Sequence, residues 1–182
     1  MLVQHRLELS FATAHVQAPL TWEMTRRFET MMFNVTSLNV GVHEADMRLS
    51  LIGEPQMVKQ AKAYLKDLGV TVKTRSSHRY KGKIPDVSMR PHNTREDQRT
   101  VERKLWMTIL GTSRREPFLW IIARRFGTTY KIMQCASGEK VAIISLLVSG
   151  PEEEVANVVS YLRGQGINVE YGEVSVSAPF MD

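Results

Sequence analysis

Hydrophobic and polar residues follow the same order of periods in each half of the chain. Near the start, Leu7, Leu9 and Phe11 alternate with polar residues, the two-residue period of a strand with one buried face. Apolar residues then recur at helical spacing from Pro19, a residue that suits the first turn of a helix. The first half is predicted to form a strand at 7–11, a helix from 19, strands at 35–42 and 47–52, a helix from 55 and a strand at 70–74.

The second half repeats this pattern closely enough to indicate a duplicated unit. Five residues around the first helix recur at a constant offset of 98, among them Trp22 and Trp120. Five more around the second helix recur at an offset of 97, so one deleted residue reconciles the two registers. The second half is predicted to form strands at 105–111, 129–136, 141–149 and 167–171, and helices at 117–126 and 152–165.

Each unit therefore has the order strand, helix, strand, strand, helix, strand, which is a split βαβ unit. Right-handed crossovers close such a unit into a four-stranded antiparallel sheet with both helices on one face. We expect an α+β protein made of two tandem ferredoxin-like sandwiches. The predicted domains are repeat 1 at residues 1–75, a linker at 76–99 and repeat 2 at 100–182, and whether the repeats pack together stays open.

Charge and composition exclude several classes of function. The formal net charge is +5, and most of the excess lies between Arg75 and Arg99. This stretch contains seven basic and three acidic residues and has no apolar period, which is typical of an exposed linker.

The longest apolar stretch is too short to span a membrane, and the start of the chain does not resemble a signal peptide, so we expect a cytoplasmic protein. Cys135 is the only cysteine. We expect no disulfide, no metal site, no cofactor and no catalytic activity, because no recognisable set of catalytic residues is present.

The two sheets are expected to differ on the face that their helices leave uncovered. In repeat 1 this face is polar, with Glu8, Ser10, Asp46, Arg48, Ser50, Thr71 and Lys73, whereas repeat 2 has Trp106, Thr108, Leu110, Val141, Ile143, Ser145 and Leu147 there. Strands that are apolar on both faces indicate cover on both faces. We expect a homodimer through repeat 2, with its interface at Trp106, Leu110, Val141, Ile143 and Leu147. The linker or the tail around Phe180 is the alternative cover.

The run from Arg103 to Glu173 resembles the NIL domain, an ACT-like regulatory domain at the C-terminus of methionine-import ABC transporter ATPases. The resemblance rests on the order and spacing of a glycine ending the first strand, a proline opening the helix, "ARRF" near its end, an apolar hairpin and the closing "YLRGQGINVEYG". Repeat 1 is a more divergent copy, with "APLTWEMTRRF", "FNV" and "YLKDLGVTVK". The resemblance implies a regulatory module that senses a small molecule such as methionine and acts through dimerisation or an unidentified partner protein.

The resemblance also implies where a ligand would bind. Gly111, Thr112 and Ser113 precede the helix at Pro117, where exposed backbone N–H groups suit a carboxylate. The family's Asn-Ile-Leu segment falls on Asn34, Val35 and Thr36 in repeat 1, and on Lys131, Ile132 and Met133 in repeat 2. The predicted ligand-binding residues are Asn34, Val35, Gly111, Thr112, Ser113, Lys131 and Ile132.

Two further pairs recur between the repeats. Trp22 and Trp120 are expected to cover their helices next to the neighbouring repeat, and the arginine pairs at 26–27 and 124–125 are expected to be solvated helix ends. RNA binding and a pure assembly role stay open as alternatives, since RNA-recognition domains share the topology. That mode stacks bases on aromatic residues of the open sheet face, where repeat 1 has none and repeat 2 only Trp106.

Overall fold

The computed structural model describes residues 1–13, 19–91, 99–111 and 117–172. Repeat 1 contains two helices and a four-stranded antiparallel sheet, sheet A, in the order β2-β3-β1-β4. This is the strand order of a ferredoxin-like unit, and it follows from two crossovers that each skip a neighbouring strand. The elements are β1 (Val3–Ala12), α2 (Leu20–Arg27), β2 (Met32–Val40), β3 (Glu44–Gly53), α3 (Pro55–Asp67) and β4 (Thr71–Arg79).

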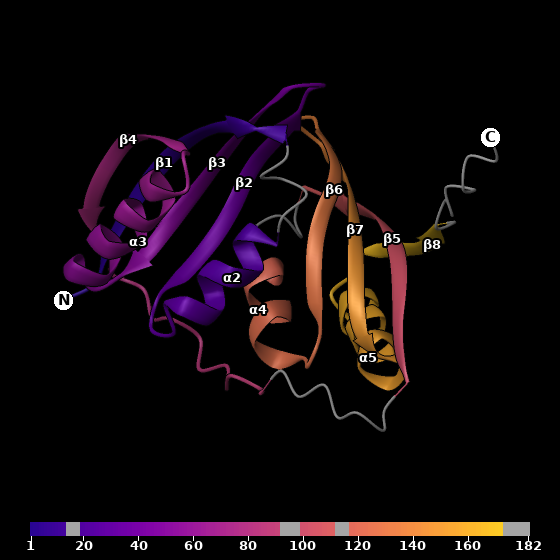
Figure 1. The fold of residues 1–182 in the computed structure, drawn as a ribbon. Helices are drawn as coiled ribbons and strands as arrows, with labels where there is room; N and C mark the ends of the chain where they lie inside the picture. Colours follow the sequence, from indigo (N-terminus) through magenta and orange to yellow (C-terminus); the bar gives the residue numbers. More distant parts are fainter. Residues whose placement is uncertain (14–18, 92–98, 112–116, 173–182) are drawn as a thin grey trace.

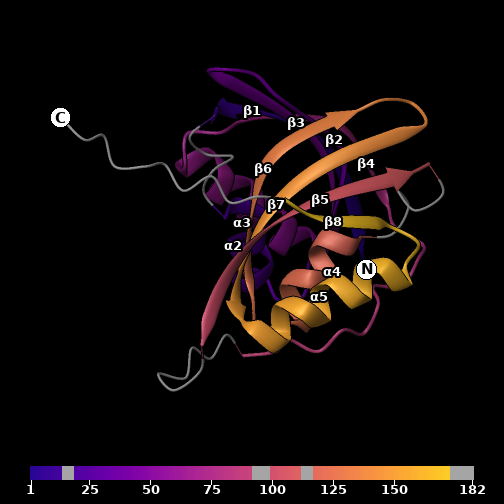
Figure 2. The ribbon, with the colours of Figure 1, turned by 90° about the vertical axis from the view of Figure 1, so that its right-hand side faces the viewer.

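Repeat 2 has the same topology, with sheet B in the order β6-β7-β5-β8 (Figure 1). The prediction of two tandem α+β sandwiches is therefore confirmed. Figure 2 shows α4 and α5 together on one side of sheet B. The elements are β5 (Thr100–Leu110), α4 (Phe118–Arg125), β6 (Thr129–Ser137), β7 (Val141–Pro151), α5 (Glu152–Gly164) and β8 (Asn168–Gly172).

Strand β4 is longer than the sequence pattern predicts. It continues to Arg79, where a strand ending at Thr74 was expected, because β1 begins at Val3 and supplies partners for the extra residues. Along this extension His5 pairs with Ser77, and Val3 pairs with Arg79. Apart from Val3, these strand ends carry polar residues on both faces, so no apolar alternation marks them, and the residues from 76 to 79 belong to sheet A.

The second helix of each repeat ends at a glycine in the left-handed region. Gly69 has φ 85° and Gly166 has φ 79°, a conformation that glycine adopts without the strain of a side chain. The N–H of Val70 donates to the carbonyl of Leu65, and the N–H of Ile167 donates to that of Leu162. These local capping hydrogen bonds satisfy carbonyls that a helix end leaves free. The expected cap at Gly69 is confirmed.

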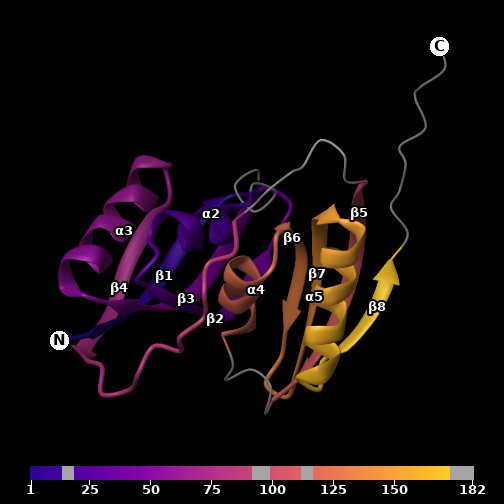
Figure 3. The ribbon, with the colours of Figure 1, turned by 90° about the horizontal axis from the view of Figure 1, so that it is seen from below.

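The two repeats pack on each other along their edge strands. Strands β2 and β6 lie at the facing edges of sheets A and B, with α2 and α4 alongside (Figures 1 and 3). Each edge strand carries a bulge at an equivalent position, Thr36 in β2 and Met133 in β6. A bulge twists an edge strand away from regular pairing. The sheets stay separate, and side chains make the junction.

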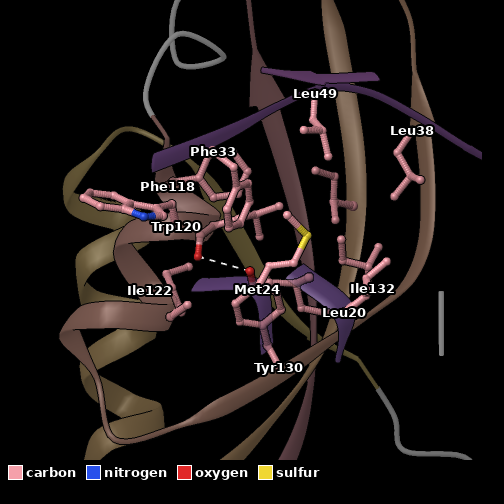
Figure 4. Close-up of a cluster of buried hydrophobic side chains, with 14 of the residues drawn as sticks. Leu20, Met24, Phe33, Leu38, Leu49, Phe118, Trp120, Ile122, Tyr130 and Ile132 are labelled. Carbon is pink, nitrogen blue, oxygen red and sulfur yellow. Dashed lines mark hydrogen bonds between the residues drawn. The ribbon is translucent and has the colours of Figure 1, made fainter. Parts of the chain in front are cut away.

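One hydrophobic core runs through both repeats. Figure 4 shows Leu20 and Met24 of repeat 1 beside Ile122, Tyr130 and Ile132 of repeat 2. All five are at most 6% exposed. Each repeat alone would leave this surface in water, and burial is worth about 25 cal/mol for each Å² of apolar surface. The repeats therefore depend on each other for part of their stability.

The described part of the linker, residues 80–91, runs over the junction on the helix side. The N–H of Arg90 donates to the carbonyl of Arg124, and the Arg90 side chain pairs with Glu154 at 2.9 Å. Ile84 and Val87 are half-buried against the core. This described part of the linker is thus held by backbone hydrogen bonding and by a carboxylate, on the side of the helices.

Across the residues that the structure describes, every helix is too short or too polar to cross a membrane.

Candidate ligand site between the repeats

Each repeat has a tryptophan that donates a hydrogen bond to the backbone of the other repeat. The indole N–H of Trp22 donates to the carbonyl of Thr128, and that of Trp120 donates to the carbonyl of Met31, both at 2.8 Å. Met31 and Thr128 are themselves equivalent, since each precedes the edge strand of its repeat. The junction therefore has an approximate two-fold symmetry. The expectation that both tryptophans cover their helices next to the other repeat is confirmed.

Two arginines cross the same junction. Arg26 donates to the carbonyl of Phe126 at 3.2 Å, and Arg124 donates to the carbonyl of Glu29. The expectation of solvated helix ends is wrong for these two, because both are half-buried, and burial lowers the pKa of each guanidinium. It holds for the exposed Arg27 and Arg125. Backbone carbonyls rather than carboxylates receive these N–H groups, which the sequence pattern does not reveal.

A buried polar contact breaks the symmetry of the junction. The hydroxyl of Thr21 donates to the Tyr130 hydroxyl at 3.0 Å, and Tyr130 donates to the carbonyl of Leu119 at 3.2 Å. The equivalents of Thr21 and Tyr130 in the other repeat are Leu119 and Phe33, which carry no hydroxyl. Burial raises the pKa of the Tyr130 phenol, so this group stays protonated and acts as a donor.

Beside this contact lies a small cavity that both repeats line. Its walls come from β2 of repeat 1 and from β5, β6, β7 and the start of α4 in repeat 2. Val35 and Ile132, predicted from opposite repeats as ligand-binding residues, both line it. The full lining is Val35, Thr36, Ser37, Leu38, Ile109, Phe118, Leu119, Ile132, Cys135, Ala142 and Ile144.

The cavity measures about 40 Å³. At roughly 10–15 Å³ for each water molecule, this space holds about three or four waters, and it is far below the roughly 300 Å³ of the smallest typical ligand pocket. Apart from the hydroxyls of Thr36 and Ser37, its side chains are apolar or weakly polar. The cavity as it stands accepts the end of an apolar side chain, and a larger group enters only if the walls move apart.

At two lining positions repeat 2 has a smaller residue than repeat 1, although Leu38 of repeat 1 lines the cavity as well. Cys135 and Ile109 line the cavity, whereas Leu38 and Phe11 occupy the equivalent positions in repeat 1. Ile109 near the end of β5 and Phe118 at the start of α4 both line the cavity.

The other predicted ligand residues lie in different places. Asn34 faces the open side of sheet A, where it lines a polar hollow. Lys131 is exposed and pairs across strands with Leu147 on the open side of sheet B. Gly111 follows β5 at its end, donates to the carbonyl of Lys140 at 3.1 Å and has room for a side chain. Thr112 and Ser113 lie outside the described residues.

The predicted interface residues do gather on the open face of sheet B. Leu110 is 59% exposed, Ile143 43% and Val141 37%. Trp106 and Leu147 are half-buried on the same face. Trp106 lies over the end of β8, since a Cβ on Gly172 would come within 2.7 Å of the indole Nε1. Next to this face, a concave region of about 540 Å³ reaches Val42, which is 85% exposed at the tip of the β2–β3 hairpin.

Several cavity residues escaped the sequence analysis. Phe118, Leu119 and Ile109 read as ordinary core positions of a helix and a strand, and Cys135 reads as a small strand residue. A signal was nevertheless present. Comparing the two repeats position by position shows Cys135 against Leu38, which is a loss of side-chain volume inside a duplicated core.

Comparisons with known proteins agree with this architecture. The profile of the NIL domain family matches residues 5–74 and 105–171, which is one match in each repeat. In a comparison with curated protein sequences, no significant match is found.

Three solved structures show similarity over most of their length. An unknown protein from Galdieria sulphuraria is 13% identical with a TM-score of 0.33, covering 96% of this chain and 99% of its own. A protein from Bacteroides thetaiotaomicron is 12% identical with a TM-score of 0.28, covering 93% and 92%. A putative glycine cleavage system transcriptional repressor is 8% identical with a TM-score of 0.32, covering 96% and 98%.

Proposed function

The chain belongs to the NIL domain family, with one NIL domain in each repeat, and from this premise we propose that it is a regulatory, non-catalytic module that binds a small molecule between its repeats. A ligand that binds at a junction changes the free energy of that junction, and this change is what a regulatory module transmits. The output then passes through a second copy of the chain or through a partner protein.

The observation that carries the proposal is the cavity that both repeats line. A ligand there contacts Val35 from one repeat and Ile132 from the other at the same time. Because the cavity is only about 40 Å³, a bound side chain pushes its walls apart. Binding is therefore coupled to the relative position of β2 and β6, the two edge strands at the junction.

The lining favours an amino acid with a flexible apolar side chain, and methionine fits this description. A thioether chain is unbranched and polarisable, so it fills an irregular apolar space. Thr36 is an exposed lining residue, and its hydroxyl, which donates to the carbonyl of Arg48 at 3.1 Å, can still accept a hydrogen bond from the ammonium of such a ligand. The predicted contribution of Gly111 to the carboxylate is part of this proposal.

The test is thermal unfolding of the full chain with a panel of amino acids, methionine included, and glycine as the control for ionic and osmotic effects. A ligand at 100 times its Kd stabilises by about 2.7 kcal/mol, which is several degrees in Tm. Cys135→Leu, which places the repeat 1 residue in the cavity, should abolish this shift. Cys135→Ser, of similar volume, should retain it.

Asn34→Ala and Lys131→Ala complete the series. A loss of the Tm shift in Asn34→Ala would indicate that the polar end of the ligand lies on the open face of sheet A. A loss in Lys131→Ala would indicate the open face of sheet B. The proposal fails if every amino acid behaves like glycine, or if Cys135→Leu shifts as far as the unaltered protein does.

We further propose that the open face of sheet B is the contact between two copies of the chain. The exposed apolar residues of this face need an apolar partner, and the corresponding face of sheet A is polar. A face that meets its own copy forms an isologous contact with closed two-fold symmetry. Trp106, Leu110, Val141, Ile143 and Leu147 would form its centre.

The measurement is solution mass by light scattering. Ile143→Glu should convert a dimer to a monomer, because each copy would bury an unpaired carboxylate at the contact. Thr71→Glu, which places the same carboxylate on the open face of sheet A, is the matched control and should leave the mass unchanged. A protein that is monomeric before any substitution contradicts this part of the proposal.

A further inference from the structure

The open face of sheet A carries a polar hollow of about 650 Å³, which shares only Thr36 with the lining of the cavity between the repeats. Its size falls within the range of small-molecule sites, roughly 300–1,000 Å³. Three of its residues are arginines and one is a glutamate, so it has an excess of two positive charges. The lining is Gln4, Arg6, Leu7, Glu8, Asn34, Thr36, Arg48, Leu49, Ser50 and Arg75.

Two of the arginines are fixed in place by the glutamate. Arg48 Nε donates to one Glu8 oxygen at 3.1 Å, and Arg75 Nε donates to the other at 2.6 Å. Arg75 is the extra residue of a bulge in β4, which turns its side chain toward Glu8. Both guanidinium groups are held at their Nε edges, and each remains more than half exposed.

Arg6 has a different surrounding. It is exposed on β1, next to Glu8 along the open face, and no hydrogen bond or ion pair joins it to another residue in the described part of the chain. Glu8 already uses both of its oxygens on the other two arginines. The hollow is therefore lined by three guanidinium groups and one carboxylate.

Neutral groups complete the hollow. The amide of Gln4 donates to the Ser50 hydroxyl at 3.1 Å. Asn34 in β2 is the cross-strand partner of Ser50 in β3 and also lines the hollow. These groups offer both donors and acceptors to a bound molecule. Aromatic side chains are not among the lining residues, so the hollow lacks the stacking surface that single-stranded RNA binders use.

We propose that this hollow is a binding site for a small anion with at least two anionic oxygens, either a phosphate ester or a dicarboxylate, with Arg6 as the principal contact. Guanidinium groups bind such oxygens through paired N–H donors. The Glu8 bridge orients Arg48 and Arg75 before the ligand arrives, which lowers the cost of ordering them. The site serves a second ligand and does not depend on the cavity between the repeats.

Repeat 2 supports this assignment by contrast. The equivalents of Glu8, Arg48 and Arg75 are Trp106, Ser145 and Gly172, so the ion-paired set is replaced as a unit, whereas the equivalent of Arg6 is Lys104, which keeps the positive charge. Ser145 is fully buried, and Trp106 lies over Gly172. The same fold therefore does not need a charged set at these positions.

The test is isothermal titration calorimetry of the full chain with inorganic phosphate, with succinate and with a single-stranded RNA oligonucleotide, at constant ionic strength set with chloride. We expect phosphate or succinate to bind, and the stronger of the two identifies the ligand class. Arg6→Gln should weaken this binding at least tenfold. The Tm without ligand should stay unchanged, because Arg6 makes no contact that the fold requires.

Lys140→Gln, in the exposed turn of repeat 2, removes the same charge far from the hollow and should leave binding within twofold. Three results would overturn the proposal: no heat from either small anion, equal weakening in both variants, or RNA binding that is lost in Arg6→Gln while both small anions fail to bind. The loss of methionine binding at the other site does not affect any of these readouts.

Discussion

The open faces of the two sheets show how one fold can carry two different surfaces. In repeat 1, Glu8 pairs across strands with Arg48, and in repeat 2 the equivalent pair is Trp106 with Ser145. Strand order and the register of these two pairs are the same, so backbone geometry does not explain the difference between the pairs, although β4 has a bulge at Arg75 that β8 lacks. Side chains that face solvent are free to change as long as the helix-facing residues still pack. Duplication has thus produced one polar face and one apolar face on a shared core.

The largest expected effect concerns the two tryptophans of the junction. Trp120 is 1% exposed, whereas Trp22 is half-buried, although both make the same hydrogen bond. Trp120→Ala should lower the free energy of unfolding by about 3–5 kcal/mol. Trp22→Ala should cost about 1–2 kcal/mol, because water already reaches part of its ring. Chemical denaturation measures both, and equal losses would contradict the asymmetry.

A smaller effect is expected from the contact between Thr21 and Tyr130. Tyr130→Phe should cost about 1–2 kcal/mol, because it leaves the buried Thr21 hydroxyl and the Leu119 carbonyl without this partner. Adding Thr21→Leu creates the pair found at the equivalent positions, Phe33 and Leu119, and should recover part of the loss. A double-mutant cycle gives the coupling energy directly, and a value near zero would show that the two hydroxyls act independently.

The next largest effect is expected at Gly172, which lies under the ring of Trp106. A Cβ at residue 172 would lie 2.7 Å from the indole Nε1 and 2.8 Å from Cδ1, and a rigid ring can relieve this only by moving as a whole. Gly172→Ala should therefore cost about 1 kcal/mol and shift the tryptophan fluorescence spectrum. Gly164→Ala is the control, since a Cβ there meets nothing within 4 Å. An unchanged spectrum would mean that Trp106 is free to move.

The smallest effect is the pH dependence of the Glu8 ion pairs. The hydrogen bond from Arg75 and the charges of Arg75 and Arg48 hold the Glu8 pKa below its ordinary value of 4.5. A lowered carboxyl pKa stabilises the folded state above the pKa of the unfolded chain, and this contribution is lost as pH falls through the folded pKa. Glu8→Gln should flatten the stability profile below about pH 4.5. Glu44→Gln is the exposed control, and an identical flattening there would contradict the assignment.

Short-range patterns were sufficient to predict the fold. Pro55 and Gly69 bound a helix whose apolar residues share one face, and Pro151 and Gly166 do the same in repeat 2, so element order followed from local chemistry. The contacts between the two repeats have no comparable pattern in the sequence. Arg26 and Arg124 donate to carbonyls about 100 residues away, and a backbone acceptor has no sequence signature.

The predicted ligand-binding residues also show that local patterns could be predicted and long-range contacts could not. Val35 and Ile132 meet at one cavity because edge strands at equivalent positions face each other, which required knowing that the repeats pack. Asn34 and Lys131, one residue earlier in each strand, face the opposite way, since strand side chains alternate. The extension of β4 and its bulge at Arg75 were also hidden, because they occur among polar residues with no alternation.

The reciprocal bonds from Trp22 and Trp120 have a consequence for how such a chain could arise. A surface that satisfies its own copy under two-fold rotation works between separate molecules as well as between linked ones. Fusing the two copies replaces an encounter that depends on concentration with one set by the tether, equivalent to a local concentration of the order of millimolar. Once the tether secures the pairing, the two partners no longer need to be identical, and each becomes free to specialise.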